Sequence, residues 1–320
     1  MSRLIELETP HVRHGCSTTP RDPLLPSFQP GEPLLMILET DKLLPLIRRA
    51  ATLFRGTPGR KGAIVHLDDS VEEVMVVGDL HGNLAGFARA LRKADLEHHP
   101  HRHLVLQELV HGKTMYPEEG GDQSHQLVDA VCALKCRHPR QVHLILGNHE
   151  LAEVTGRRIA KGGNLLNELF FRGLTTAHHD RAAEVHRAYQ ELFTSLPVMV
   201  RAPNRILICH TIPEESDFET FNPTVLETGR WTLADAQRGG TIYALTWGRD
   251  FRPETVDRFA HIMDADLFIN GHTPCPDTGF QSPNHRQLII DGTLAQPAYC
   301  LFPTGQPLTL DDLVQRAAFA

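Results

Sequence analysis

Four short segments that contain aspartate, asparagine or histidine each follow a run of apolar residues in this chain. The apolar runs have the length and composition of buried strands. Carboxylate, amide and imidazole groups are common ligands of divalent metal ions in proteins. We therefore expect strand ends to bring these groups together in one site for two metal ions. The segments are Gly78-Asp79-Leu80-His81-Gly82, Gly147-Asn148-His149-Glu150, Cys209-His210-Thr211 and Gly271-His272-Thr273.

The first segment offers two ligands after a predicted strand at 74–77. Its glycines permit a tight turn, and Asp79 and His81 then lie on the same side of that turn. The pair alone is a weak signal, because an aspartate after a strand is also a common helix N-cap. The other segments supply the support that the pair lacks.

The second segment is more specific, because a neutral amide and an imidazole follow a strand that ends at glycine. Asn148 and His149 come directly after the predicted strand 142–146. His210 and His272 then repeat the arrangement after two further apolar runs. A third and a fourth occurrence of one pattern favour a shared metal site over isolated histidines of the core.

The elements that must position these groups alternate between strand and helix from residue 71 onward, which predicts an α/β fold. The segment 1–33 holds prolines that forbid a continuous helix, and 34–55 has helical apolar spacing. We predict an N-terminal extension over 1–70, an irregular arm plus a helix, and one domain over 71–320. The predicted strands are 74–77, 104–106, 142–146, 206–209, 267–270 and 287–291, and the predicted helices include 83–93, 124–136 and 253–263.

The composition narrows the function classes. The chain has 320 residues with 41% hydrophobic content, which is enough for a large core. A net charge of −7 and no obvious cluster of Lys and Arg argue against nucleic acid as a partner. Six cysteines without a C-x-x-C pair indicate reduced thiols. There is no apolar signal segment and no run of about 18 apolar residues, so we expect a soluble, cytoplasmic protein with no membrane partner.

The strings Gly-Asp-x-His-Gly and Gly-Asn-His-Glu resemble those of the calcineurin-like metallophosphoesterase superfamily, specifically its phosphoprotein phosphatase branch. The resemblance covers residues 71–292 and includes the helical segment 126–135 and Leu196-Pro197. It implies a four-layer αββα sandwich with a dinuclear metal site at strand ends. It also implies a metal-dependent phosphoric ester hydrolase, in the first place a serine/threonine protein phosphatase whose nucleophile is a metal-bridging hydroxide.

By position, the resemblance assigns the metal ligands. Asp79 and His81 would hold one ion, and Asn148, His210 and His272 would hold the other. Two divalent cations are implied, with Mn²⁺ expected from the resemblance. Iron and zinc are the alternatives, because carboxylate, amide and imidazole ligands without thiolate favour these metals over calcium or magnesium.

A further string departs from the family. The family has Gly-Asp-x-Val-Asp-Arg-Gly after the second strand, where the first aspartate bridges the metals, the second orients the catalytic histidine and the arginine binds phosphate. This chain has Gln107-Glu108-Leu109-Val110-His111-Gly112 there. We predict Glu108 as the bridge. Counting back from Lys135 suggests an insertion directly after Glu108, which places Glu119 at the second aspartate and leaves the arginine without a counterpart.

The remaining roles are assigned to nearby residues. His149 is the predicted general acid for the leaving group, with a carboxylate neighbour that keeps its ring charged. Glu119, or Glu118, is predicted to orient it. For the phosphate we prefer Arg249, because 245–249 resembles a Leu-x-Trp-x-Arg stretch of bacterial relatives. The other phosphate-binding candidates are Lys113, Arg157 and Arg158.

Two alternatives stay open beside a phosphorylated protein as substrate. Hydrolysis of a dinucleoside polyphosphate or another small phosphoester is one, because a fold does not fix its substrate and the arginine is missing. A degenerate protein that binds metal or a phosphorylated ligand without turnover is the other, because the Gln107-Glu108 string is altered.

Overall fold

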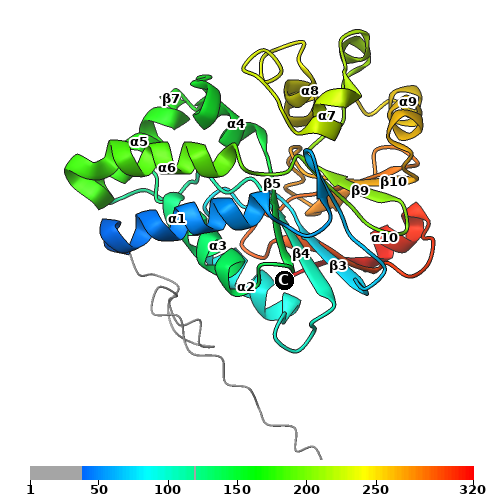
Figure 1. The fold of residues 1–320 in the computed structure, drawn as a ribbon, viewed down its shortest axis with the longest axis horizontal. Helices are drawn as coiled ribbons and strands as arrows, with labels where there is room; N and C mark the ends of the chain where they lie inside the picture. The colour runs from blue at the N-terminus through cyan, green and yellow to red at the C-terminus, as the bar shows by residue number, and fades with distance from the viewer. Residues whose placement is uncertain (1–37, 119) are drawn as a thin grey trace, which may run out of the picture.

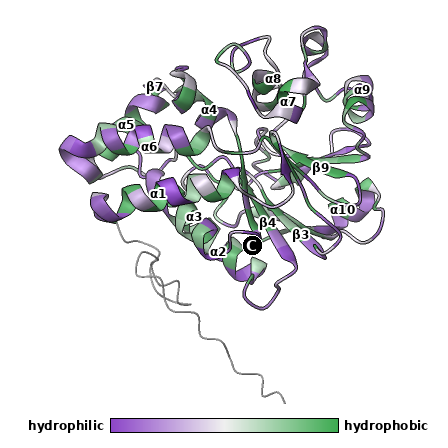
Figure 2. Ribbon diagram, in the orientation of Figure 1, coloured by the Kyte–Doolittle hydropathy of each residue, from purple (hydrophilic) through white to green (hydrophobic). Residues whose placement is uncertain are grey.

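Two β-sheets pack face to face in the computed structural model, which describes residues 38–118 and 120–320 (Figure 1). Helices flank the sheets, so the fold is the mixed α/β sandwich that we predicted. Helices α1, α2, α3, α5 and α6 gather on one side of the molecule, and α7, α8 and α9 on the other (Figure 1). Figure 2 shows the apolar residues concentrated in the strands and on the inward sides of the helices.

The five-stranded sheet carries the first half of the site. Its strands β3, β4 and β5 are parallel, and β13 pairs antiparallel with β3. Alternate residues of β3 face opposite layers: Val74 and Val76 pack between the sheets, and Met75 and Val77 pack under the helices. The order is β14 (Ala317–Phe319), β13 (Ala298–Pro303), β3 (Glu73–Val77), β4 (Arg102–Gln107) and β5 (Val142–Ile145).

The seven-stranded sheet carries the second half. Strands β9, β10 and β12 are parallel and fully buried, which explains their continuous apolar sequences. Phe259 of α9 stacks on Phe268 of β10 at a centroid distance of 5.3 Å and so covers the outer face. The order is β1 (Arg60–Lys61), β2 (Ile64–His66), β8 (Met199–Arg201), β9 (Ile206–Cys209), β10 (Leu267–Asn270), β12 (Gln287–Ile290) and β11 (Phe280–Gln281).

The helices cover the outer faces and connect the strands. Helix α4 begins directly at the site, and two residues separate it from the end of β5. A two-stranded hairpin of β6 (Ala160–Lys161) and β7 (Asn164–Leu165) follows it. The helices are α1 (Thr40–Arg55), α2 (Leu84–Ala94), α3 (His125–Arg137), α4 (Asn148–Thr155), α5 (Leu166–His178), α6 (Ala182–Phe193), α7 (Pro223–Thr228), α8 (Thr241–Trp247), α9 (Pro253–Met263) and α10 (Leu310–Arg316). None of the helices in the described part of the chain is long and apolar enough to cross a membrane.

Helix α1 and strand β2 precede the predicted domain boundary at residue 70 but pack in the same core as the residues after it. Leu43, Ile47 and Phe54 of α1 are buried against α3 and α6. Strand β2 joins the seven-stranded sheet beside β8. The predicted irregular arm lies outside the described residues.

The predicted strands and helices agree with β3, β4, β5, β9, β10, β12, α2, α3 and α9 to within two residues at each end. Elements that we did not predict include α4, α7, α8, α10 and β13. The sequence of β13 is an unbroken run of apolar residues, Ala298 to Pro303, so the signal for this strand was present in the sequence. The 110–122 segment is a loop beside the site, apart from an isolated bridge between Met115 and Asp122.

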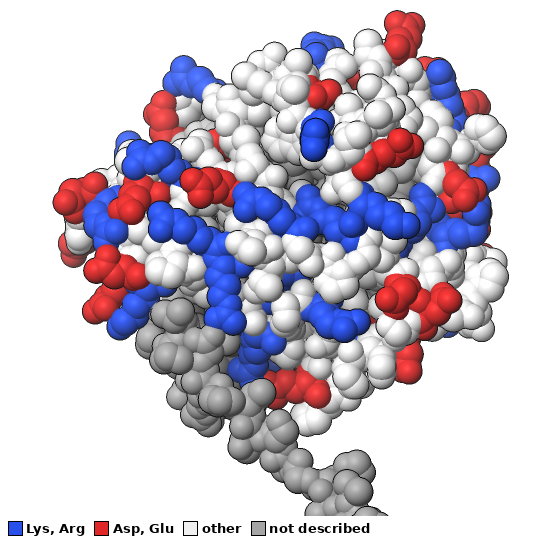
Figure 3. Space-filling model, viewed as in Figure 1, with Lys and Arg blue, Asp and Glu red and all other residues white. Residues whose placement is uncertain are grey.

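The charge pattern differs from one expectation. The sequence shows no obvious cluster of basic residues, but a band of Lys and Arg side chains crosses the face drawn in Figure 3, at the level of α1. Arg48 and Arg55 of α1 are exposed. The basic residues that are spread along the chain are therefore gathered by the fold on this face.

Candidate metal centre

The predicted ligands come together where parallel strands end. Asp79 follows β3, Glu108 follows β4, and Asn148 begins α4 after β5. His210 and His272 follow β9 and β10 of the other sheet. Because parallel strands present their carboxyl ends at one edge, each sheet delivers its polar groups to the same region between the layers.

Glu108 lies at the centre of the cluster and is 1% exposed. Its Oε2 atom is 3.3 Å from His210 Nε2 and 3.5 Å from His81 Nε2. Potential ligand atoms form two groups, His81 with Glu108 and His149, and Glu108 with His210 and His272. Within each group all atoms lie within 4.8 Å of one another. Glu108 is the member that the two groups share, which is the position of a bridging carboxylate.

Two histidines present an unprotonated Nε2 to the cluster. His81 donates its Nδ1 hydrogen to the Val110 carbonyl at 2.8 Å. His272 hydrogen-bonds to the backbone of Trp247, and its buried Nε2 has no partner among the described residues. A neutral imidazole whose other nitrogen is held by a carbonyl is the form in which histidine binds metals.

His210 is surrounded by hydrogen-bond acceptors. Its Nδ1 contacts Gln107 Oε1 at 3.0 Å, and its Nε2 contacts Asn148 Oδ1 at 3.0 Å as well as the carboxylate of Glu108. Burial alone would lower the pKa of His210, but the charges of Glu108 and Asp79 outweigh this effect and raise it to about 9. A proton is therefore held at Nε2, in a place where a cation would satisfy the same acceptors.

Asp79 completes the set. Its Oδ2 accepts the backbone N–H of His272 at 2.7 Å, and its buried Oδ1 has no hydrogen-bond partner among the described residues. This Oδ1 lies 3.8 Å from His210 Nδ1, so Asp79 is close to the ligands of the second sheet as well as to its own. Buried acceptors without donors are costly unless a cation binds them. The residues present therefore fit divalent metal ions.

The sequence of the chain also identifies its family. The sequence model described as "Calcineurin-like phosphoesterase" matches residues 73–276, which is well over half of the chain. The chain belongs to the calcineurin-like phosphoesterase family. It is a phosphoester hydrolase, and the family uses a dinuclear site of divalent metal ions.

Solved structures support the fold of this phosphoesterase. A protein serine/threonine phosphatase from Saccharomyces cerevisiae with similarity to human phosphatase PP5 matches with a TM-score of 0.63 and 18% identity, over 88% of this chain and 89% of that chain. A cold-active protein tyrosine phosphatase (TM-score 0.48, 12% identity, 75% of both chains) and a proposed diadenosine tetraphosphatase (TM-score 0.40, 16% identity, 82% of this chain and 99% of that chain) match less well. At these identities the first likeness establishes the fold alone.

Glycine at two strand ends lets the backbone approach the ligands of the phosphoesterase. A Cβ atom at Gly271 would lie 2.1 Å from Asp79 Oδ1, and one at Gly147 would lie 2.5 Å from Glu108 Oε1. Both distances are far below van der Waals contact. Glycine is therefore needed at both positions because the carboxylates pack against the backbone there.

Glu150 holds the segment that carries Glu108, a role that the sequence analysis did not assign. Its Oε1 accepts the backbone N–H groups of Leu109 at 2.7 Å and Val110 at 3.2 Å. Burial, with the charge of Glu108 added, raises the pKa of Glu150 to about 7. Its identity is visible in the Gly-Asn-His-Glu string, but its contact is not.

The side chain that contacts the ring of His149 is His111. The two Nδ1 atoms are 2.8 Å apart. Glu119 lies outside the described residues, and Glu118 is exposed. His111 occupies the fifth place of the Gln107–Gly112 string, where the family has its second aspartate. An ungapped reading of that string would have found it.

We predicted that the extra residues of this string come directly after Glu108. They lie instead after Gly112. Residues 113–123 fold back on themselves through hydrogen bonds from Tyr116 to Gly121 and from Gln123 to Thr114. Among the described residues, the carboxylate neighbour of His149 is Glu108, with a potential ligand atom within 4.8 Å of one from His149. Burial lowers the pKa of His149 well below its usual value.

The phosphate-binding candidates differ in their surroundings. Arg249 is exposed, and its Nη1 is 3.5 Å from the Thr273 hydroxyl, next to His272. Arg157 stacks on Trp247, with 4.6 Å from the guanidinium carbon to the ring centroid. Arg158 instead pairs with Glu168 at 3.0 Å, and Lys113 is exposed. Arg249 is thus the phosphate-binding candidate that lies beside the candidate ligand His272.

Proposed function

We propose that this phosphoesterase is a metal-dependent phosphoric monoester hydrolase that removes phosphate from phosphoserine or phosphothreonine in proteins. The observation that carries the proposal is the buried acceptor cluster in which Glu108 is shared by two groups of ligand atoms. The similarity of the fold to a serine/threonine phosphatase supports the protein substrate.

The residues that would hold the metals divide between the sheets. Asp79, His81 and Glu108 would hold one ion, and Glu108 would share the other with the remaining ligands, which are Asn148, His210 and His272. Mn²⁺ is our proposal, with iron or zinc as alternatives, because the donors are oxygen and imidazole nitrogen. When bound, two such ions activate water at neutral pH and offset the charge of the phosphoryl group.

The other residues bind and orient the substrate. Arg249 would bind phosphoryl oxygens at the His272 side, where its guanidinium can donate two parallel hydrogen bonds. His149 is tied to the cluster because its backbone N–H donates to Glu108 Oε1 at 2.9 Å. Its ring would deliver a proton to the leaving oxygen.

The test compares substrates on the purified, Mn²⁺-loaded protein. We expect release of phosphate from p-nitrophenyl phosphate and from a phosphoserine peptide, with a higher kcat/KM for the peptide than for a dinucleoside tetraphosphate. Preference for the dinucleotide would replace the protein substrate by a small phosphoester. A protein that binds two metal ions per chain, cleaves none of these substrates and gains cleavage through Glu108→Asp would be a degenerate binding protein.

A further inference from the structure

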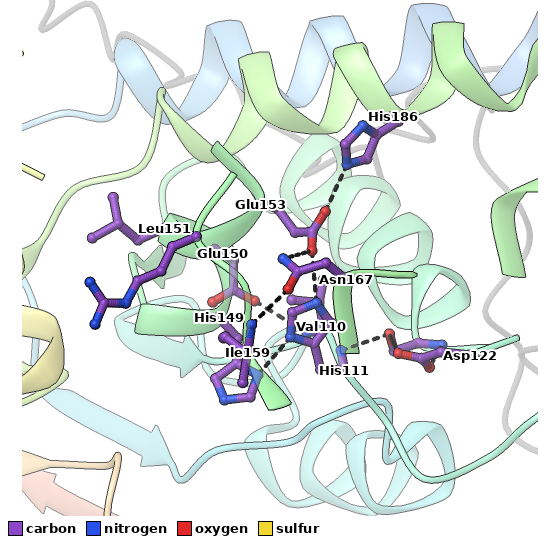
Figure 4. A network of polar contacts seen from close by, with 12 residues as sticks. Val110, His111, Asp122, His149, Glu150, Leu151, Glu153, Ile159, Asn167 and His186 are labelled. Atoms are coloured by element: carbon purple, nitrogen blue, oxygen red, sulfur yellow. Dashed lines mark hydrogen bonds and ion pairs between the residues drawn. The ribbon is translucent and has the colours of Figure 1, made fainter. Parts of the chain in front are cut away.

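A chain of hydrogen bonds leads from the metal centre to helix α6 (Figure 4). His149 Nδ1 contacts His111 Nδ1 at 2.8 Å, and His111 Nε2 contacts Glu153 Oε1 at 2.8 Å. The other carboxylate oxygen of Glu153, Oε2, contacts His186 Nε2 at 2.7 Å. Neither Glu153 nor His186 is a candidate metal ligand or a residue of the motifs found in the sequence.

Glu153 is a buried carboxylate that is held in its ionised form. It is 4% exposed, and Asn167 Nδ2 donates a further hydrogen bond to Oε1 at 2.7 Å. Burial alone would raise the pKa of Glu153, but the hydrogen bonds from His111 and His186 outweigh it and lower the pKa. An ionised carboxylate can only accept, so the Nε2 atoms of both histidines carry hydrogen.

This acceptor fixes the ring of His111. Its side chain is fully buried, its edge packs near Phe170 at a centroid distance of 5.9 Å, and its backbone N–H donates to Ser124 Oγ at 3.0 Å. With Nε2 bound to Glu153, Nδ1 can only face His149. One hydrogen lies between the two Nδ1 atoms, whichever ring carries it.

The contact also fixes the ring of His149. Because its Nδ1 faces His111, its Nε2 lies on the opposite edge of the ring and faces the site, beside His81, whose ring centroid is 4.6 Å away. If the ring turned over, Nε2 would leave the site and a C–H group would take its place. The direction in which His149 offers its nitrogen therefore depends on a residue that does not touch it.

We propose that Glu153 is a positioning residue for the leaving-group step: acting through His111, it holds His149 with Nε2 towards the metal centre. The inference rests on the proposed function of His149 as the proton donor. In the family string described above, an aspartate orients the catalytic histidine. In this chain the ring of His111 lies between His149 and the carboxylate of Glu153.

Glu153 also has structural contacts that a test must separate from this role. Its backbone carbonyl accepts a hydrogen bond from Gln190 Nε2 at 2.7 Å, and Asn167 links it to the backbone N–H of Ile159 at the start of the β6–β7 hairpin. Loss of these contacts would lower the stability of the protein, and the resulting loss of activity would be the same for every substrate. A leaving-group comparison responds to the proton donor alone, because p-nitrophenolate leaves without a proton and a serine alkoxide does not.

The experiment measures both substrates for Glu153→Gln in the Mn²⁺-loaded full chain. Since general acids contribute roughly 10²–10⁴-fold, we expect kcat for the phosphoserine peptide to fall by at least about 10-fold and kcat for p-nitrophenyl phosphate by less than about 3-fold. KM and the metal content should not change. Glu191→Gln, an exposed substitution on α6, is the matched control. Equal losses for both substrates, or no loss, would overturn the proposal.

A second variant tests the same idea by rescue. Oδ1 of an aspartate at position 111 would lie where the Nδ1 atom of His111 lies now, and would contact His149 directly. The double variant His111→Asp with Glu153→Gln should therefore regain activity on the phosphopeptide relative to Glu153→Gln. No recovery in a folded, metal-loaded double variant would contradict the positioning role.

A spectroscopic measurement separates this inference from the proposed function. In two-bond ¹H–¹⁵N spectra of the histidine rings, Glu153→Gln should change the nitrogen signals of His111 and His149, and leave those of exposed His98 unchanged. Unchanged His149 signals would refute the orienting role even if the wild-type protein hydrolyses phosphoesters. A wild-type protein without hydrolysis but with the expected spectral change would refute the proposed function alone.

Discussion

Glu108 Oε2 lies 3.3 Å from His210 Nε2, with both side chains buried. Each residue follows a strand of a different sheet, so this contact joins the two halves of the fold at the site. The pair is held in charged form by mutual attraction at low solvent exposure. A metal ion between them would take over the role of the His210 proton.

Removing the charge of Glu108 should therefore remove the metals. We expect Glu108→Gln to lower the metal content below one ion per chain and kcat by at least about 10²-fold, since a bridging ligand serves both ions. Metal analysis after dialysis and an aryl phosphate assay measure the two effects. The exposed Glu168→Gln is the matched control. Retention of two ions by Glu108→Gln would show that the bridge lies elsewhere.

His149→Ala should separate turnover from metal binding. The residue is proposed to act on the leaving group and not as a ligand, so we expect kcat for a phosphoserine peptide to fall roughly 10²–10⁴-fold with two metal ions retained. The two potential ligand groups make the opposite outcome informative, because one of them includes His149. A loss of metal in parallel with activity would make His149 a ligand.

Arg249→Ala should weaken phosphate binding without affecting the fold. We expect the inhibition constant of inorganic phosphate and KM to rise about 10-fold, as for the loss of one or two charge-assisted hydrogen bonds. The unfolding free energy should change by less than about 0.5 kcal/mol, because the side chain is exposed. Arg252→Ala, which removes a neighbouring exposed arginine paired with Asp250, is the control. Equal effects of both substitutions would point to a general loss of positive charge.

Candidate ligands could be predicted where a short stretch of sequence, a strand followed by a polar residue, contains the whole signal. Asp79, His210 and His272 could be named as candidate ligands because each follows an apolar strand, and the structure brings their side chains to one region. His111 was missed because we placed an insertion directly after Glu108, whereas the extra residues lie after Gly112. The choice between the two positions depends on Glu150, whose carboxylate binds the backbone at Leu109 and Val110 and fixes the register of this segment.

The parts that the sequence did not predict depend on contacts between distant segments. Glu153 lies one turn beyond His149 on α4. A glutamate there is expected on the solvent-exposed face of a helix, but α6 packs over it and brings His186 to its carboxylate. In the same way, α1 has a helical pattern that gives no indication of its partners. Its burial against α3 and α6 made residues 40–55 part of the core and not an appended segment.

Lys135 offers a test of the core away from the site. Its side chain is fully buried on α3, and its ammonium group donates to Thr57 Oγ1, Pro139 O and Val142 O at 2.7–3.0 Å. It also lies 4.8 Å from the ring centroid of Phe54. Burial, with the charge of Arg60 added, lowers the pKa of Lys135 from 10.5 to about 7.

This shift makes stability depend on pH in a defined direction. The unfolded chain keeps the lysine protonated up to about pH 10, whereas the folded protein releases the proton above about pH 7, so the unfolded state binds more protons in between. The free energy of unfolding contributed by this residue should therefore rise with pH above 7, by up to about 1.4 kcal/mol per pH unit. Below pH 7 both states are protonated and the contribution is constant.

Urea unfolding of the wild type, Lys135→Met and the exposed control Lys93→Met at pH 6.5, 7.5 and 8.5 measures this contribution. The stability difference between wild type and Lys135→Met should grow in favour of the wild type as the pH rises from 7.5 to 8.5. The difference between wild type and Lys93→Met should stay constant. A constant difference for Lys135→Met as well would mean that three acceptors and an aromatic ring suffice to keep a buried ammonium charged, and that hydrogen bonding outweighs desolvation at this position.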